Sequence, residues 1–310
     1  MGAVARLRQR RVTARTAFVL SGGGSLGALQ AGMLRALYER RIVPDLLVAT
    51  SAGALNAAFV ASRPQTLATA DALADVWRGV RRDDVFPLRP WAIAAGVLAR
   101  RDHIVPPHRL RRLIANHVEF DDLADSAIPL HIVTFDVERA EEVVLSSGPA
   151  VDALTAAASI PGVLPPVTVG GRRLIDGGVV NNTPVSRALA LGARRIYVLP
   201  TRMVPMPGVP YRHGSLGESA DGLPMLTGRR LASYLARYSA EIVPLPAPNP
   251  LNVPPVDFTQ AERLIADATT AARRRLGELL DGRSGPYRGQ SPHPFGSRVL
   301  RRVARADVDA

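Results

Sequence analysis

The chain contains no cysteine, which excludes disulfides, thiolate-ligated metal sites and a thiol nucleophile. Aromatic residues make up only 5% of the sequence, although 47% of it is hydrophobic, so the core must consist mainly of Ala, Val and Leu. No run of 18 apolar residues occurs, so the sequence predicts no transmembrane segment. What remains is a chain of 310 residues that is rich in small apolar side chains and long enough for one large α/β domain.

Lysine is absent as well. All 39 basic residues are arginine, and the formal net charge is +12. Such a charge favours nucleic acid or an anionic membrane surface as a partner, but it also results from coding bias in GC-rich DNA. We favour the second explanation, because no nucleic-acid motif or basic patch interleaved with aromatic residues is present. We expect no nucleic-acid partner and leave peripheral contact with a membrane surface open.

The ends of the chain carry no recognisable targeting signal. Residues 1–16 are Arg-rich without an apolar run, and 17–20 is too short for the hydrophobic part of a secretory signal. Arg6 stands where myristoylation requires Ser or Thr. We therefore expect a cytoplasmic protein with an Arg-rich disordered arm at 1–16, one domain at 17–280 and a disordered tail at 281–310.

A Gly-rich turn separates the first expected strand, 17–20, from a helix over 28–41. Gly22, Gly24 and Gly27 match G-x-G-x-x-G, a weak dinucleotide-binding signal when it stands alone. Such a site also needs an acidic residue at the carboxyl end of the second strand, whereas Asp45 stands at the start of that strand. Backbone N–H groups of consecutive glycines serve equally well as an oxyanion hole.

Ser51 lies between an apolar run at 46–48, which predicts a buried strand, and a small-residue helix over 52–59. A serine on a tight strand-to-helix turn is the arrangement of a hydrolase nucleophile, although a serine in this position is also a common helix cap. Ala49 replaces the first glycine of G-x-S-x-G, which is tolerated if its φ is negative. Because both turns follow parallel strands, the glycine amides and the Ser51 hydroxyl are expected at the same edge of the sheet.

Asp176 follows a short expected strand and precedes Gly177 and Gly178. An Asp-Gly pair is usually a hairpin turn, but the expected helix over 184–191 makes a plain hairpin a poorer explanation here. Further helices are expected at 66–78, from about Pro107, and at 150–159, 226–238 and 258–280, and further strands at 130–137, 142–145 and 193–199.

Two segments allow more than one interpretation. The apolar stretch 86–98 is interpreted as ordinary core, as a lid over a site or as an interfacial contact. His103, His108 and His117 lack metal-ligand spacing with carboxylates and are interpreted as surface residues, so no metal or cofactor is expected.

Four blocks of the sequence together resemble the patatin-like phospholipases, over about residues 17–200. They are Ser21–Gly27, Ala49–Gly53, Ser159–Val167 and Asp176–Pro184. The resemblance implies a three-layer α/β/α sandwich with a mainly parallel sheet, and hydrolysis of lipid or other acyl esters by a Ser–Asp dyad. It implies that Ser51 is the nucleophile, that Asp176 is its partner, and that Gly22, Gly23 and Gly24 form the oxyanion hole. Leu26 stands where many members have Arg or Lys, which puts a preference for anionic head groups in doubt.

Three alternatives to the dyad stay open at this stage. The order Ser51, Asp176, His213 also fits a hydrolase triad, although His213 stands in a Pro- and Gly-rich segment. The glycine turn could serve a nucleotide-binding protein. A non-catalytic lipid-binding relative is the third alternative, and the presence of both Ser51 and Asp176 argues against it.

Overall fold

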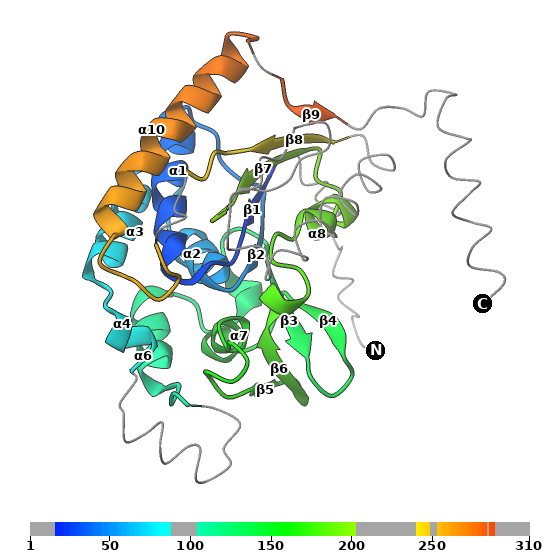
Figure 1. Cartoon of the computed structure of the whole chain (residues 1–310). Coiled ribbons are helices and arrows are strands. Elements are labelled where there is room, and N and C mark those ends of the chain that lie inside the picture. The colour runs from blue at the N-terminus through cyan, green and yellow to red at the C-terminus, as the bar shows by residue number, and fades with distance from the viewer. Residues whose placement is uncertain (1–15, 88–103, 203–239, 249–252, 284, 289–310) are drawn as a thin grey trace, which may run out of the picture.

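The computed structural model describes residues 16–87, 104–202, 240–248, 253–283 and 285–288. These residues form one mixed β-sheet with helices on both faces (Figure 1). The strand order is β5-β6-β3-β2-β1-β7-β8-β9, and β4 pairs with β3 as a branch of the same sheet. The strands are β1 (Thr16–Leu20), β2 (Leu46–Thr50), β3 (Leu130–Asp136), β4 (Glu141–Leu145), β5 (Val167–Val169), β6 (Arg172–Asp176), β7 (Arg195–Leu199), β8 (Glu241–Pro244) and β9 (Tyr287–Arg288).

The centre of the sheet is parallel. β3, β2, β1, β7 and β8 run side by side in the same direction, whereas β4, β5, β6 and β9 pair antiparallel. All five residues of β2 are buried, and β1 is buried from Ala17 onwards. Continuous apolar strands of this kind need cover on both faces, which explains why the central strands lie between helices.

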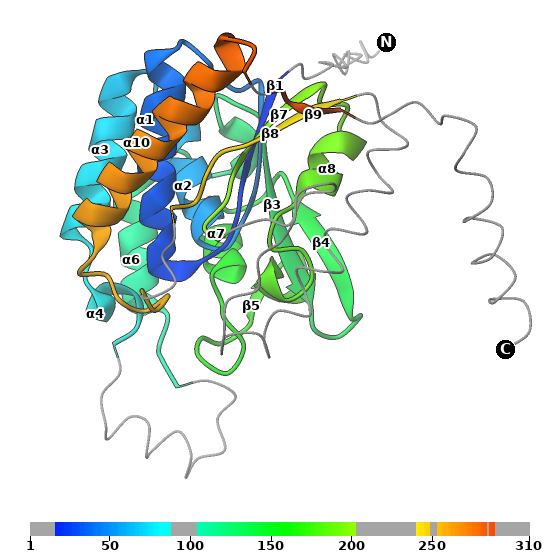
Figure 2. The same cartoon turned by 45° about the horizontal axis from the view of Figure 1, so that its top comes forward.

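One face of the sheet carries a thick helical layer. Figures 1 and 2 show α1, α3 and α10 packed beside one another on this side, with α2 beneath them against the strands. The core on this side includes Phe18 and Leu20 of β1, Leu47 of β2 and Ile132 of β3. The helices of this layer are α1 (Ala28–Glu39), α2 (Ala52–Ala61), α3 (Leu67–Gly79), α4 (Arg82–Val85), α6 (His108–His117), α7 (Ala150–Ala157) and α10 (Ala261–Leu280).

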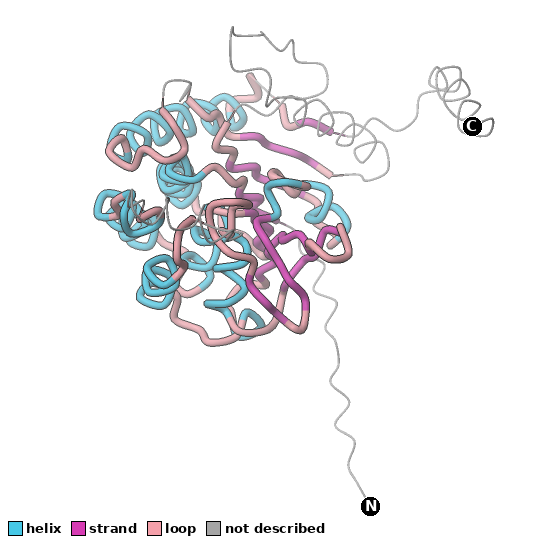
Figure 3. The backbone as a smooth tube through the Cα atoms, turned by 60° about the horizontal axis from the view of Figure 1, so that its bottom comes forward, coloured by secondary structure: helices cyan, strands magenta, loops and turns pink. Residues whose placement is uncertain are grey.

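The other face has a thinner layer. Ala17, Val19 and Val48 point to this side and form a second core with Val185 and Leu189 of α8 (Val185–Ala190). Among the described helices, α8 is the one that packs on this face. The arrangement of helices around the strands in Figure 3 agrees with this. The molecule is therefore the expected α/β/α sandwich with a mainly parallel sheet.

The regular elements expected from the sequence are present within a few residues of their expected bounds, except where they lie outside the described residues. The first 15 residues, His103, His213, the helix expected at 226–238 and most of 86–98 fall outside them. Of the segment 86–98, Phe86 is described and buried.

Among the α-helices and strands of the described residues, four short ones were not expected: α4, β5, β8 and β9. The β5–β6 hairpin turns at Gly170 and Gly171, both at positive φ, rather than at the Asp-Gly pair. β9 extends the ordered domain beyond 280, because its backbone pairs with the edge of β8. No helix within the described ranges is long and apolar enough to cross a membrane.

Candidate active site

Two strands that point toward each other bring Ser51 and Asp176 together. β2 pairs with β3 as far as Thr50 opposite Val133, and β6 pairs with β3 from Asp176 opposite Thr134. β4 occupies the other edge of β3 along both stretches, so β2 and β6 share one edge. β2 is parallel to β3 and β6 is antiparallel, so their carboxyl ends meet there. This register places residues 125 positions apart beside each other.

Ser51 sits on a sharp turn between β2 and α2. Its backbone has φ 55° and ψ −131°, a conformation that costs an L-residue free energy and is typical of functional sites. Its side chain makes no capping hydrogen bond to α2, so the helix-cap explanation of this serine is wrong. Ala49 is buried within β2 and is not among the residues at positive φ, so the missing glycine causes no strain.

The Ser51 hydroxyl donates a hydrogen bond of 2.6 Å to Asp176 Oδ2. Both residues are buried, with 8% and 5% of their surface exposed. The other carboxylate oxygen, Oδ1, accepts the Gly178 N–H at 2.8 Å. Burial raises the pKa of Asp176 from 3.8 to about 6, and the hydrogen bonds from Ser51 and Gly178 offset part of that rise. The carboxylate is thus desolvated and has no cationic partner among the described residues.

The Gly-rich turn lies directly against Ser51. A Cβ on Gly22 would stand 2.8 Å from Ser51 Cβ and 2.4 Å from Asn182 Oδ1, so only glycine fits. The Gly22 N–H donates to the Asn182 carbonyl at 3.1 Å, which removes this amide from the expected set of three oxyanion donors. The amides of Gly23 and Gly24 donate to no other described residue. They are the two that stay available for a ligand.

A buried polar network, which the sequence did not reveal, holds this turn in place. Gln30 of α1 donates to the carbonyls of Ser21 and Leu199 at 2.8 and 2.9 Å. Asn56 of α2 donates to Gln30 Oε1 at 2.8 Å and to the Gly27 carbonyl at 2.9 Å, and it accepts from the indole of Trp77. The network therefore fixes both ends of the turn. Amide residues inside otherwise apolar helices were the available sequence signal.

Several expected features lie elsewhere or stay unassigned. Asp45 accepts the Thr16 N–H at the amino end of β1, far from the turn, so it does not complete a dinucleotide site. Leu26 is buried in the hydrophobic core. No described histidine contacts Ser51 or Asp176 through a hydrogen bond. Within the ranges that the structure describes, no three His, Asp or Glu side chains cluster as metal ligands.

The sheet order, the strained serine turn and the Ser51–Asp176 pair define an α/β protein with a hydrolase-like site. The family model of the patatin-like phospholipases matches residues 18–189. Because this match covers more than half of the chain, the chain belongs to the patatin-like phospholipase family.

Relatives of known sequence share 27–30% identity with this chain. Lysophospholipase NTE1 of Mycosarcoma maydis is 28% identical over 202 residues, which cover 63% of this chain and 10% of that protein. An uncharacterised NTE family protein of Mycobacterium tuberculosis is 28% identical over 293 residues, 86% of this chain and 47% of that protein. The chain thus spans less than half the length of these relatives.

Two solved structures match this chain at low similarity. VipD from Legionella pneumophila has a TM-score of 0.44 at 12% identity, covering 86% of this chain and 67% of that one. ExoU of Pseudomonas aeruginosa, in its complex with SpcU, has a TM-score of 0.39 at 21% identity, covering 86% of this chain and 52% of that one.

Proposed function

We propose that this protein is a serine acyl hydrolase that cleaves lipid esters of the phospholipase A or lysophospholipase type, with Ser51 as nucleophile and Asp176 as its base. The observation that carries the proposal is the 2.6 Å hydrogen bond from the Ser51 hydroxyl to a buried carboxylate. Membership of the patatin-like phospholipase family supports an ester bond of a lipid as the target.

The raised pKa of Asp176 makes it an effective base. A serine hydroxyl is a weak nucleophile until a neighbour takes its proton during attack. An ordinary aspartate, with a pKa near 3.9, is too weak a base for that task near neutral pH. A carboxylate with a pKa of about 6 is still ionised at pH 7 but binds the proton far more readily.

The reaction follows from this pair. Ser51 Oγ attacks the ester carbonyl carbon while its proton moves to Asp176 Oδ2. The tetrahedral intermediate collapses, the C–O bond to the alcohol breaks, and the alcohol leaves with that proton. Water then attacks the acyl-Ser51 ester and gives its proton to Asp176. When this second intermediate collapses, the bond from Ser51 Oγ to the acyl carbon breaks and Asp176 returns its proton to Ser51 Oγ. The fatty acid leaves, the Ser51 hydroxyl is restored, and the cycle requires no metal or cofactor.

The negative charge on the carbonyl oxygen needs donors, and the Gly-rich turn is our proposed source. The amides of Gly23 and Gly24 are unused within the described structure, whereas Gly22 fixes the turn through Asn182. α2 begins directly after Ser51, so the positive end of its dipole also favours an anion there. Removal of one oxyanion donor typically costs about 2.7–4 kcal/mol in the transition state.

A triad with His213 is the alternative mechanism, and His213 lies outside the described residues. The His213→Ala variant separates the two, because a dyad enzyme keeps its activity without this imidazole. A non-catalytic relative is the alternative function.

A fluorophosphonate probe tests the catalytic proposal. We expect covalent labelling of wild type at Ser51, identified by peptide mapping, and hydrolysis of p-nitrophenyl esters. Folded protein that neither reacts with the probe nor hydrolyses any ester would refute catalysis and favour lipid binding instead.

A further inference from the structure

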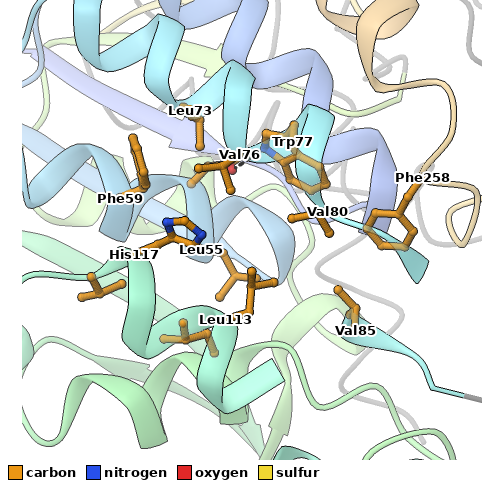
Figure 4. Close-up of a pocket in the computed structure, with 13 residues that line it drawn as sticks. Leu55, Phe59, Leu73, Val76, Trp77, Val80, Val85, Leu113, His117 and Phe258 are labelled. Carbon is orange, nitrogen blue, oxygen red and sulfur yellow. Dashed lines mark hydrogen bonds between the residues drawn. The ribbon is translucent and has the colours of Figure 1, made fainter. Parts of the chain in front are cut away.

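A cavity between α2, α3, α4 and α6 has a lining suited to a hydrocarbon chain (Figure 4). Its volume is about 70 Å³. One water needs about 10–15 Å³ of such space, so the cavity holds a short column of methylene groups and not a whole diacyl lipid. All lining side chains except Asn56 and His117 are apolar. The apolar lining residues are Leu55, Phe59, Leu73, Val76, Trp77, Val80, Val85, Leu113, Ile114, Val118 and Phe258.

The two polar side chains at the cavity do not make it a polar site. Asn56 is buried, and its side-chain amide is already hydrogen-bonded to Gln30, Gly27 and Trp77. Burial and the nearby Arg63 lower the pKa of His117, so this imidazole is uncharged at neutral pH. A charged or strongly polar ligand would therefore find no partner in the cavity.

The first turn of α2, the helix that follows Ser51, lines the cavity. Leu55 lies in that turn and is the one residue of α2 that is not fully buried. The Trp77 indole also lines the cavity and donates a hydrogen bond to Asn56 of α2. A Cβ on Gly27 would stand 2.6 Å from the Trp77 ring and 3.1 Å from Ala52 Cβ, so cavity wall and Gly-rich turn are in contact.

A second element joins the cavity to the turn. Pro255 accepts the Ser25 N–H at 2.8 Å, and three residues later Phe258 stacks on Trp77 with ring centroids 6.3 Å apart. The far end of the cavity is formed by Phe59 and His117, whose rings lie 6.2 Å apart. Figure 4 shows Phe258 and Val85 on one side of the cavity, and Phe59 and His117 on the other.

From these contacts we infer that the cavity binds the acyl chain of the ester attacked by Ser51, and that the Phe59–His117 end limits the chain length. This inference rests on the proposed function. Each methylene buried contributes about 0.8 kcal/mol, equivalent to an increase of about fourfold in kcat/KM, until the cavity is full. Beyond that length kcat/KM stops rising.

The first test is a series of p-nitrophenyl esters from acetate to palmitate. Val76→Phe fills the cavity from a partly exposed position of α3, and Val43→Phe makes the same change at an exposed position outside it. We expect Val76→Phe to lower the octanoate-to-acetate ratio of kcat/KM at least tenfold, and Val43→Phe to leave it unchanged. An unchanged ratio in Val76→Phe would overturn the inference.

The second test does not depend on catalysis. Trp77 lines the cavity, and replacing the second tryptophan, Trp91, with Phe leaves Trp77 as the single fluorophore. We expect 11-bromoundecanoic acid, but not undecanoic acid, to quench its fluorescence saturably, and the added Val76→Phe change to abolish the quenching. Ester hydrolysis without quenching would refute acyl-chain binding in the cavity and leave the proposed function standing. Quenching without ester hydrolysis would refute the proposed function and leave the cavity as a fatty-acid site.

Discussion

Two buried aspartates on neighbouring strands have opposite pKa shifts. Asp136 ends β3 and Asp176 ends β6. In the pairing of these strands Asp176 lies opposite Thr134, two residues before Asp136. Burial raises the pKa of both. At Asp136, hydrogen bonds from the N–H groups of Arg139 and Glu138 and from the Arg139 guanidinium outweigh burial, so its pKa is lowered. Asp176 has one hydroxyl and one amide as partners, and its pKa is raised to about 6.

The difference teaches what separates a structural carboxylate from a proposed base. Asp136 is held as an anion that fixes the β3–β4 turn, because a cation and two amides compensate its burial. Asp176 keeps part of its desolvation cost uncompensated, and its Ser51 partner is the group that would react. The fold therefore compensates the burial of Asp136 with hydrogen bonds and a cation, and leaves the burial of Asp176 only partly compensated.

The largest effect is expected from removing the carboxylate of Asp176 or the hydroxyl of its partner Ser51. Asp176→Asn and Ser51→Ala should each lower kcat for p-nitrophenyl ester hydrolysis by at least about 1,000-fold, because nucleophile and base act as a unit. Asp136→Asn should lower Tm, because the anion that the Arg139 guanidinium and two amides stabilise is lost. Its kcat, measured on folded protein, should stay within about threefold of wild type. Equal losses of kcat in the Asp176 and Asp136 variants would contradict separate roles.

A smaller loss is expected from the turn beside Ser51. Gly22→Ala places a Cβ 2.4 Å from Asn182 Oδ1 and 2.8 Å from Ser51 Cβ, so the turn must shift. We expect kcat to fall about 100-fold, because a shift of the turn displaces the Gly23 and Gly24 amides that we propose as oxyanion donors. Gly79→Ala is the control, because its Cβ would meet nothing within 4 Å. Circular dichroism verifies that both variants fold, and wild-type kcat in folded Gly22→Ala would show that the turn plays no part.

The raised pKa of Asp176 also predicts a stability effect. The folded state binds the Asp176 proton more tightly than the unfolded chain does. The contribution of Asp176 to the free energy of unfolding is therefore lost as pH rises from about 4 to about 6. The shift corresponds to about 3 kcal/mol. The free energy of unfolding of Asp176→Asn, relative to wild type, should therefore rise by about that amount between pH 4 and pH 8. Urea unfolding at both pH values measures it, and a pH-independent difference would contradict the raised pKa.

Local patterns marked Ser51 and Asp176 as candidates, because each stands on a turn with small residues or glycines after an apolar run, and the family resemblance supplied their expected roles. They could not show why the two meet, which depends on β2 and β6 ending at adjacent positions of β3. That register is set by pairing between distant segments.

The supporting structure was less predictable for the same reason. Gln30 and Asn56 stand alone in helices, and only the packing of α1 against α2 makes them partners. The Gly22 amide was expected to face a ligand, but it donates to Asn182, which lies 160 residues away in the sequence. The cavity is built from five separate segments, so no single stretch of sequence contains it.

The central claim is that Asp176, with its raised pKa, is the base that activates Ser51. Its most direct test is the rate of Ser51 labelling by a fluorophosphonate as a function of pH, in wild type and in Asp176→Asn. The account predicts a wild-type rate that rises with pH to a plateau, is half-maximal near pH 6, and is at least about 100-fold faster at the plateau than in the variant. A wild-type rate without that transition, or equal rates in both proteins, would contradict it.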